Sequence, residues 1–362
     1  MNLGIKKIRL NELENFVNSK MFREFEFVPI SLLRVKSYLK NPSATAEDTV
    51  LYLGFIENRL VAFRSIFAGS VNSANNQIRF GWCSGNWVHP DFRRKGFSEK
   101  LLNEAFNDWD KKLMFTNYAP NSENLYLKTG WFKPVHEFNG IRGYLFPKTR
   151  KLVPAANKNI LFKIVFSVID FFIFLWATFQ SIFFLGKNNP EIKFTTLKFP
   201  DKVCYQLLQR KGIETVFNRG EEELRWVFKF PWISDEETET GKKYPFSAFS
   251  NSFYYKTVKV FSDGKFAGFF IFSVREGHLK TLFFCLTNGL ENEVTIFLRK
   301  YCTRNRIEMV TVYKKELATE LLNRKFPFLH VKKYGQKIYS TFKIKNDENL
   351  NFQDGDGDTF FT

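Results

Sequence analysis

The feature that most limits how this chain can fold is an order of predicted strands and helices that occurs twice in the sequence. The spacing of apolar residues over 48–146 predicts a hairpin, a third strand, a helix, a strand, a short helix and closing strands. Residues 253–344 give the same order without obvious sequence identity, and their hairpin turns at Asp263–Gly264, a strong hairpin signal. Two copies of one order predict two α+β units in tandem, each with a central sheet flanked by helices.

An apolar segment, Ile160–Leu185, separates the two copies and is long enough to span a bilayer. As a helix it would gather its polar side chains near one stripe, namely Lys163, Ser167, Asp170, Thr178 and Ser181. Such a helix could be buried between the domains, lie in a membrane interface or cross the bilayer. A charge at the bilayer centre costs about 2.5–3.5 kcal/mol. We therefore expect one helix, or a tight helical pair, that keeps both units on the cytoplasmic side. The basic residues before it favour an anionic membrane surface; they are Lys148, Arg150, Lys151 and Lys158.

These observations divide the chain into four predicted segments. They are a first domain at 1–150, an apolar helical linker or membrane-surface segment at 151–190, a second domain at 191–345 and a flexible acidic tail at 346–362. Within the first domain, residues 5–42 are expected to be helical with breaks. The tail contains Asp-Gly-Asp-Gly-Asp at 354–358, but no distal Glu of the kind that an EF-hand needs follows it.

The charge balance, 54 Lys and Arg against 37 Asp and Glu, gives a net charge of +17. Such a field favours anionic partners: nucleic acid, an anionic membrane surface or a phosphorylated cofactor. We expect no nucleic acid, because there is no zinc spacing, RNP-like run or basic region followed by heptads. The four Cys form no CxxC pair, so we expect no metal. The N-terminus lacks an apolar signal region, which favours a reduced, cytoplasmic location with membrane association through 160–185 left open.

The strongest chemical signal lies in Trp87–Ser98, where a strand ends, a basic turn follows and a helix begins near Gly96. A helix N-terminus offers free N–H groups and the positive end of the helix dipole, which together bind phosphate. Gly96 lets the backbone approach a ligand closely, and Ser98 is small. Arg94 and Lys95 add positive charge. These residues predict a phosphate site or, alternatively, a basic turn with no ligand.

The six residues from Arg93 to Ser98 resemble motif A of the GNAT superfamily of acyl-CoA N-acyltransferases. That pattern is Arg/Gln-x-x-Gly-x-Gly/Ala, and Ser98 is the departure from it. At the expected distance, Asn121–Trp131 resembles motif B, which often ends Leu-Tyr-x-Lys-x-Gly-Phe; Trp131 stands where Phe is usual. The resemblance covers about residues 48–146. It implies a GNAT-like mixed sheet, and acetyl-CoA or another acyl-CoA as the acyl donor.

The resemblance also implies roles for individual residues. Backbone amides around Arg94–Ser98 would hold the coenzyme A pyrophosphate. The strand before them would be splayed from its neighbour and would pair with the pantetheine arm. Asn121 would cap the following helix near the cofactor. Tyr126 would protonate the departing thiolate as the catalytic general acid. The implied cofactor-binding residues are Trp87, Val88, Arg93, Arg94, Lys95, Gly96, Phe97, Ser98 and Asn121.

The general base is left open by the sequence. Residues Phe80–Asn86, on the strand before motif A, include no carboxylate, so His89 and a water held by backbone groups are the alternatives. The second unit has no comparable apparatus, because its loop at Leu286–Glu293 has one Gly, two acids and no Arg or Lys. This loop should repel a pyrophosphate, so we interpret the second unit as a degenerate GNAT-like unit.

The resulting hypothesis is an N-acyltransferase, with acetyl as the expected acyl group, that transfers from acyl-CoA to a primary amine by direct attack. The acceptor could be an amino sugar, another small amine such as a polyamine, or a peptide amine. One alternative is a tandem GNAT-like transferase that uses aminoacyl-tRNA, which the basic charge permits but an intact motif A disfavours. The other is a non-catalytic acyl-CoA-binding module.

Overall fold

The computed structural model describes residues 2–73, 76–117, 120–146, 148, 160–183, 189–211, 215–287, 289–323, 328–344 and 351–361. The chain forms two compact units. Unit 1 consists of Met1–Glu137, Leu208–Asn251 and Gln336–Thr362, and unit 2 consists of Phe138–Leu207 and Ser252–Gly335. Two α+β units are what the repeated element order predicts, but the units do not follow the expected boundaries at 150 and 191.

Unit 1 is built on a mixed sheet with the strand order β1-β2-β3-β4-β5-β12. Its strands are β1 Gly4–Arg9, β2 Thr49–Ile56, β3 Arg59–Ser73, β4 Asn76–Val88, β5 Leu113–Thr116 and, over residues 336–340, β12 His330–Ser340. Neighbours from β1 to β4 are antiparallel, β4 and β5 are parallel, and β5 and β12 are antiparallel. The helical expectation for 5–42 is wrong over β1, which pairs with β2; helices begin only at Leu10.

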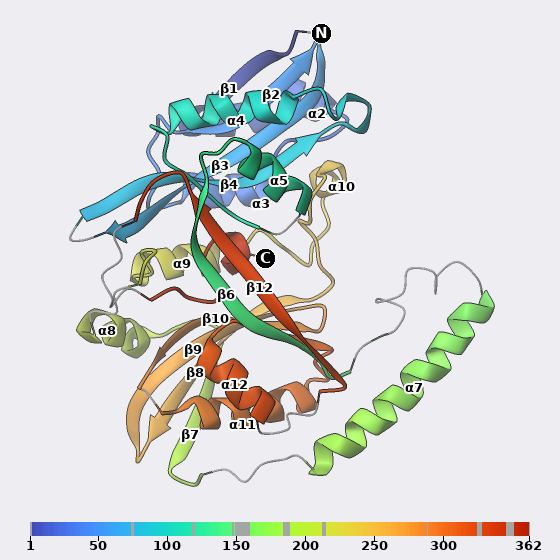
Figure 1. Ribbon diagram of the computed structural model, residues 1–362, viewed down its shortest axis with the longest axis vertical. Helices are drawn as coiled ribbons and strands as arrows, with labels where there is room; N and C mark the ends of the chain where they lie inside the picture. Colours follow the sequence, from blue (N-terminus) through green and yellow to red (C-terminus); the bar gives the residue numbers. More distant parts are fainter. Residues whose placement is uncertain are drawn as a thin grey trace. The chain divides into compact units, whose positions relative to one another are not determined.

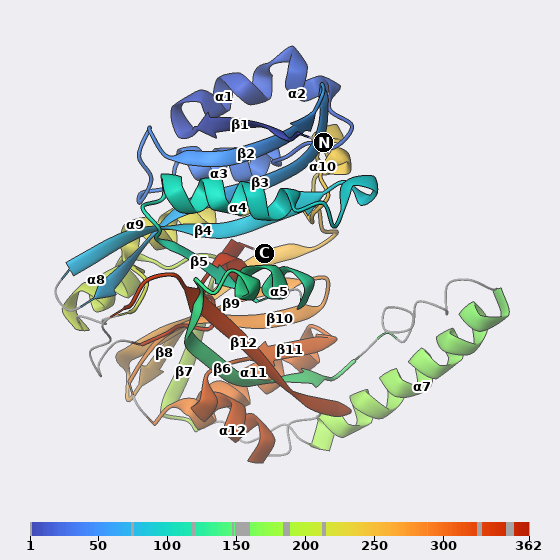
Figure 2. The ribbon, with the colours of Figure 1, turned by 45° about the horizontal axis from the view of Figure 1, so that its top comes forward.

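Helices cover both faces of this sheet (Figures 1 and 2). They are α1 Leu10–Asn18, α2 Lys20–Glu24, α3 Leu32–Leu39, α4 Phe97–Asp108, α5 Pro120–Lys128, α9 Glu221–Lys229 and α10 Glu239–Lys243, with short 3₁₀ turns at Pro90–Phe92 and Asp358–Phe361. The spacing of Leu101, Leu102 and Ala105 puts them on one face of α4, where they share a core with Ile66 and Cys83. On the other face, Phe67 of β3 contacts Trp232 and Phe361 at ring-centroid distances of 5.2 and 6.0 Å.

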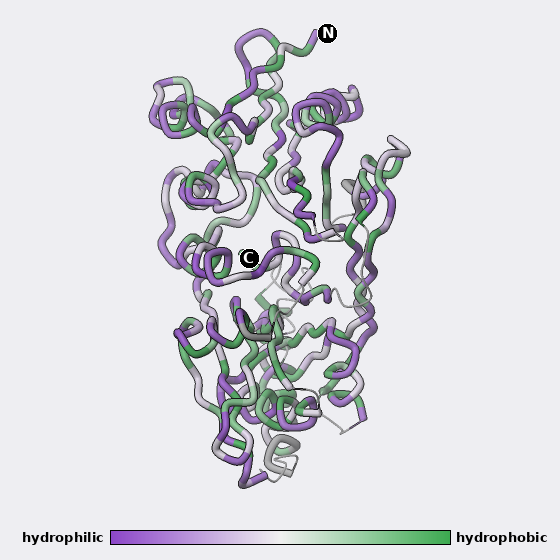
Figure 3. Tube along the Cα trace, turned by 90° about the vertical axis from the view of Figure 1, so that its left-hand side faces the viewer, coloured by the Kyte–Doolittle hydropathy of each residue, from purple (hydrophilic) through white to green (hydrophobic). Residues whose placement is uncertain are grey.

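The strands of unit 2 lie in the order β6-β11-β10-β9-β8-β7. Its strands are β6 Lys133–Tyr144, β7 Ile192–Leu197, β8 Phe253–Ser262, β9 Lys265–Arg275, β10 His278–Leu286 and β11 Met309–Val312, and its helices are α7 Ile160–Phe183, α8 Lys202–Lys211, α11 Glu291–Arg304 and α12 Lys315–Asn323. Asp263 and Gly264 turn the β8–β9 hairpin with φ of 50° and 74°, as their sequence predicts. In Figure 3, hydrophobic and hydrophilic stretches of the trace are interleaved throughout, as expected for strands and helices with one buried side.

The two sequence repeats exchange their closing strands. β6 closes the first repeat, yet its residues Ile141–Tyr144 pair with β11 of the second. β12 closes the second repeat, yet its residues Ile338–Ser340 pair with β5 of the first. Each unit is therefore completed by a strand from the other repeat, which is why a boundary placed by sequence order alone does not separate them.

The C-terminal residues differ from the flexible acidic tail expected at 346–362. Within the described part, Asp356 is fully buried, and its carboxylate accepts hydrogen bonds from Arg219 at 3.1 and 3.2 Å. Gly357 has φ of 92°, and a Cβ there would lie 2.7 Å from the Trp82 ring, so only glycine fits. Phe361 stacks on Trp232 at 4.3 Å. The Asp-Gly pattern therefore serves a tight, buried turn within unit 1.

Candidate functional site

The turn before α4 has the backbone that the sequence predicts for a phosphate site. Arg94 and Gly96 both take left-handed conformations, with φ of 64° and 75°. Gly96 is the N-cap of α4, and no side chain caps the helix there. The first N–H groups of α4 therefore have no partner within the helix. A Cβ added at Gly96 would meet nothing within 4 Å, so the turn is open to an approaching ligand.

The side chains of this turn do not all face the same way. Arg93 donates from Nε to the carbonyl of Val88 at 3.4 Å, which ties the turn to the end of β4. The Lys95 ammonium lies 4.8 Å from the centre of the Phe92 ring. Phe97 is buried in the core beneath α4. Phe97 can therefore offer a ligand its backbone N–H but not its side chain.

The strands beside this turn diverge. The parallel pairing of β4 with β5 covers only Gly81–Leu113 and Trp82–Met114. Beyond that point β4 continues, paired with β3, as far as Val88. Trp87 stacks on Phe63 of β3 at 5.4 Å. The last residues of β4 therefore have no β5 partner on their second edge, which leaves backbone groups that could pair with an extended ligand.

A buried hydrogen-bond network lies under the start of α4. The Ser98 hydroxyl donates to Asn86 of β4 at 2.6 Å, and Arg64 of β3 reaches the Ser98 carbonyl and hydroxyl oxygens at 3.3 Å. Arg64 is fully buried, and its other terminal nitrogen donates to the Tyr126 hydroxyl at 2.7 Å. The network thus joins the predicted cofactor turn to the predicted catalytic residue through an arginine that the motif resemblance does not include.

Tyr126 lies on α5 and is only 4% exposed. Its ring stacks on Phe115 at 4.1 Å. Burial raises the pKa of Tyr126 above its ordinary value, and the charge of Arg64 offsets part of that rise. Asn121, the predicted cap, lies in the first turn of α5, but its side chain is outside the described part of the structure.

His89 is poorly placed to accept a proton from a substrate. Its side chain is buried, and Arg59 Nη2 lies 2.9 Å from its Nε2. Because a guanidinium group can only donate, Nε2 must be the acceptor in this pair. The lone pair that a general base would use is therefore already occupied.

Two buried ionisable residues that the sequence analysis did not single out, Arg34 and Asp358, contact Ser84 of β4. Ser84 accepts a hydrogen bond from Arg34 at 2.6 Å and donates to the Asp358 carboxylate at 3.5 Å. The Arg34 guanidinium stacks over Trp232 at 3.9 Å. Arg34 has no distinctive sequence context, and Asp358 falls in the segment expected to be a tail. Arg64 could have been found, since it is the only charged residue in the apolar run Leu60–Phe67.

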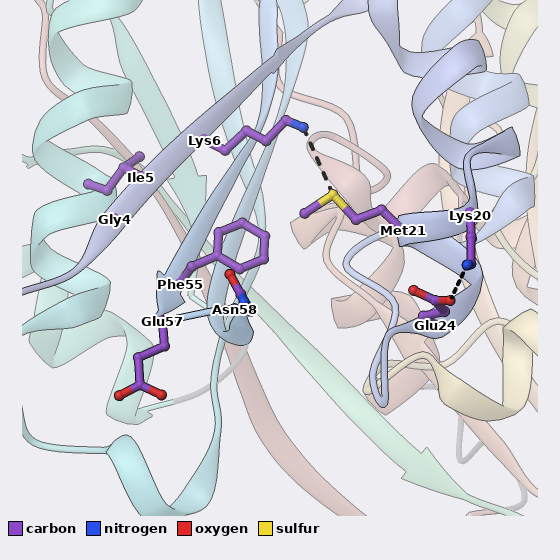
Figure 4. Close-up of a pocket in the computed structure, with 9 residues that line it drawn as sticks. All are labelled: Gly4, Ile5, Lys6, Lys20, Met21, Glu24, Phe55, Glu57 and Asn58. Carbon is purple, nitrogen blue, oxygen red and sulfur yellow. Dashed lines mark hydrogen bonds and ion pairs between the residues drawn. The ribbon is translucent and has the colours of Figure 1, made fainter.

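A surface pocket lies elsewhere in unit 1. It has a volume of about 590 Å³ and is lined by β1, α2 and the β2–β3 turn. Figure 4 shows Lys6 directed at the Met21 sulfur, at 3.9 Å, and Lys20 paired with Glu24. None of the residues that line it belongs to the α4 turn or to the Arg64 network. No group of three or more His, Cys, Asp or Glu suited to a metal occurs within the described ranges.

In unit 2 the counterpart of the α4 turn precedes α11. Gly289 again has a positive φ, 89°, but Glu291 and Glu293 occupy the first turn of the helix. Two carboxylates at a helix N-terminus already interact favourably with its dipole and would repel a phosphate. Asn288, in the same loop, lies outside the described residues.

Comparison with known proteins gives structural matches only. No family model and no curated protein sequence matches the chain. Among solved structures, a probable N-acyltransferase of unknown function from Enterococcus faecalis has a TM-score of 0.52 at 12% identity, covering 95% of this chain and 73% of that one. A tandem GNAT protein from the clavulanic acid biosynthesis pathway has a TM-score of 0.50 at 11% identity, covering 94% and 98%. Saccharomyces cerevisiae N-myristoyltransferase with bound myristoyl-CoA has a TM-score of 0.52 at 13% identity, covering 99% and 83%. These likenesses and the mixed strand pairing flanked by helices establish that the chain has a GNAT-like fold, as its motifs predict.

Proposed function

We propose that this chain is an N-acyltransferase that transfers an acyl group from acyl-CoA to a primary amine of a small molecule or peptide. The observation that carries the proposal is the divergence of β4 from β5 directly before the uncapped, open N-terminus of α4. A splayed strand edge suits an extended pantetheine arm, and a free helix N-terminus suits a pyrophosphate. The structural neighbours support an acyl-CoA donor, since one of them holds myristoyl-CoA. We keep acetyl as the expected acyl group.

In this mechanism the backbone N–H groups of Arg94–Ser98 bind the pyrophosphate, and Arg94 and Lys95 add attraction. The edge of β4 at Trp87 and Val88 pairs with the pantetheine arm. The acceptor amine attacks the thioester carbonyl carbon, the carbon–sulfur bond breaks, and the departing sulfur takes a proton from the Tyr126 hydroxyl. Arg64 is a positioning residue, because it holds that hydroxyl at 2.7 Å.

The amine must lose a proton before or during attack, and we propose Asp358 as the group that accepts it. Its carboxylate is buried and accepts a hydrogen bond from Ser84 on the diverging part of β4. His89 is the weaker candidate, because Arg59 occupies its Nε2.

The test of the cofactor site is Gly96→Glu, with Gly264→Glu as the matched control. Both glycines have nearly the same φ, 75° and 74°, and at both a Cβ would meet nothing within 4 Å. Both substitutions therefore impose the same backbone strain, of order 1–3 kcal/mol, but only Gly96→Glu adds a carboxylate beside the proposed pyrophosphate site. We expect calorimetry with acetyl-CoA to show binding lost in Gly96→Glu and kept in Gly264→Glu. Unchanged affinity in a folded Gly96→Glu protein would overturn the site.

Turnover distinguishes the proposed enzyme from its rivals. A library of primary amines, assayed with acetyl-CoA by thiol release, should include an acceptor. Binding of acetyl-CoA without thiol release on any amine would favour an acyl-CoA-binding module. Transfer that requires charged tRNA would favour the aminoacyl transferase, which the net charge of +17 permits.

A further inference from the structure

Helix α7 presents an apolar surface that unit 2 leaves exposed. The stretch Phe162–Phe179 has a mean hydropathy of 1.9 and is only 6% buried, so by length and composition the helix could cross a membrane. The side chains of Phe172, Phe179 and Ile164 are 63%, 61% and 58% exposed. The other residues of unit 2 therefore leave most of this helix uncovered. A continuous apolar surface of this kind marks a site of interaction with a protein or a membrane.

The helix has two distinct faces. One stripe, at spacings of three and four residues, carries Lys163, Ser167, Asp170, Phe174 and Ala177. The C-terminal part of this stripe contacts the rest of unit 2. The Arg306 guanidinium lies 4.9 Å from the Phe174 ring centre, and Ala177 is 2% exposed in the unit 2 core. The opposite face is apolar and exposed; it comprises Val165, Val168, Phe172, Trp176 and Phe179. The side of α7 that carries Phe174 and Ala177 therefore faces unit 2, and the apolar face lies on the opposite side of the helix.

The topology of unit 2 argues against a span. β6 leads into α7 and β7 leads out of it, and both strands belong to one hydrogen-bonded sheet, joined through β11, β10, β9 and β8. A single crossing would place the two ends of α7 on opposite sides of a bilayer, so one linker would have to return through it. Neither linker could form that second crossing, because a crossing helix needs about 20 apolar residues. The linker at 147–159 has four basic side chains, and the linker at 184–191 is too short.

The charge near the helix selects the kind of membrane. Between positions 148 and 163 the chain has five basic residues and no Asp or Glu: Lys148, Arg150, Lys151, Lys158 and Lys163. Each basic residue near an anionic surface contributes about 1 kcal/mol of attraction. A helix with a broad apolar face, a polar stripe and basic neighbours is the type that lies in a membrane interface.

We propose that α7 lies flat in the interface of an anionic lipid bilayer, with Val165, Phe172 and Phe179 turned into the acyl region and unit 2 held on one side of the membrane through Phe174 and Ala177. The chain would then be a monotopic membrane protein. This proposal does not depend on the proposed function, since it rests on α7 and the sheet of unit 2.

The test is flotation of the purified full chain with vesicles of phosphatidylcholine, with and without phosphatidylglycerol. The variant is Phe172→Glu, and the matched control is Ser167→Glu, which adds the same charge to the polar stripe of the same helix. Burying a Phe side chain is worth about 1.5–3 kcal/mol. We therefore expect vesicle partitioning to fall at least about tenfold in Phe172→Glu and to change little in Ser167→Glu. The wild-type chain should bind more strongly when phosphatidylglycerol is present.

The other outcomes each overturn the proposal. Equal loss in both variants would mean that charge alone governs binding and that the apolar face is not inserted. Failure of alkaline carbonate to release the chain, with residues 191–362 protected from added protease, would show a span. If the wild type ignores vesicles but forms an oligomer that Phe172→Glu dissociates, the face is occupied by a second copy of this chain.

Discussion

Replacing Tyr126 by Phe removes one oxygen atom and tests two roles of this side chain at once. The oxygen accepts a hydrogen bond from Arg64 at 2.7 Å, and Arg64 is fully buried. A hydrogen bond to a charged group contributes about 1.5–3 kcal/mol net, and a buried charged donor left without an acceptor costs at least as much. We expect Tyr126→Phe to lower the free energy of unfolding by about 2 kcal/mol, measured by urea denaturation followed by circular dichroism.

Arg64→Met supplies the control for this interaction. When the guanidinium is absent, removal of the Tyr126 hydroxyl should cost little, so the double-mutant cycle should give a coupling energy of about 1.5–3 kcal/mol. A coupling near zero would mean that the 2.7 Å contact does not stabilise the folded chain.

Turnover separates the catalytic role from the structural one. If Tyr126 protonates the departing thiolate, Tyr126→Phe should reduce turnover by about 10²–10⁴-fold, which is typical of general acid catalysis. Its affinity for acetyl-CoA should change much less, because the proposed contacts with the pyrophosphate come from the α4 turn. Assays should be run well below the unfolding transition. Wild-type turnover at every pH tested would remove Tyr126 from the mechanism and leave it as a packing residue.

Two further predictions concern unit 2 and the buried carboxylate of unit 1. Titration with acetyl-CoA should give a stoichiometry of one, because Glu291 and Glu293 occupy the first turn of α11; a value near two would contradict this. Burial raises the pKa of Asp356 from 3.8 to about 6, with Arg219 opposing the rise. The folded state therefore holds the proton more tightly, and this residue's contribution to the free energy of unfolding is present below pH 3.8 and declines as pH rises to about 6. Relative to Asp356→Asn, the wild type should lose at most about 3 kcal/mol across that window; equal pH slopes in the two proteins would refute it.

The backbone of the turn that we propose as the cofactor site could be predicted from sequence because its signals are local. Gly96 is required where the backbone is left-handed, and the basic residues beside it are adjacent in the chain. The tandem α+β units followed from apolar periodicity in the same way. Arg64 carried a usable signal, a lone charge within an apolar strand, since such a residue must find partners when buried.

The remaining features depend on partners distant in the sequence. Gly4–Arg9 has no clear alternation of apolar residues, and it becomes a strand because it pairs with β2. Asp356 and Asp358 belong to the Asp-Gly-Asp-Gly-Asp run at 354–358, a composition typical of a solvated tail. They are buried because Phe360 and Phe361 pack into unit 1 and because Arg219 pairs with Asp356. Neither the strand at Gly4–Arg9 nor the burial of Asp356 and Asp358 can be predicted from the local sequence, because both depend on contacts with distant residues.

The exchange of closing strands leads to a final prediction, that residues 1–150 will not form a stable acyl-CoA-binding domain when expressed alone. This fragment contains the whole GNAT motif region but lacks the β12 pairing of β5, the Tyr339 ring stacked on Phe115 at 4.8 Å, and Trp232 packed on Phe67 at 5.2 Å. Burial of a large side chain is worth about 1.5–3 kcal/mol, and Tyr339, Trp232 and Phe361 are all buried in unit 1. Their loss, about 5–9 kcal/mol in sum, is comparable to the whole net stability of a typical domain. The fragment should show no cooperative unfolding transition and no binding of acetyl-CoA by calorimetry. Coexpression with residues 151–362 should restore both, because the missing strand and aromatic side chains then come from the second fragment. A fragment 1–150 that binds acetyl-CoA as tightly as the full chain would show that the exchanged strand and the C-terminal residues are dispensable, and that the boundary at 150 separates a complete domain.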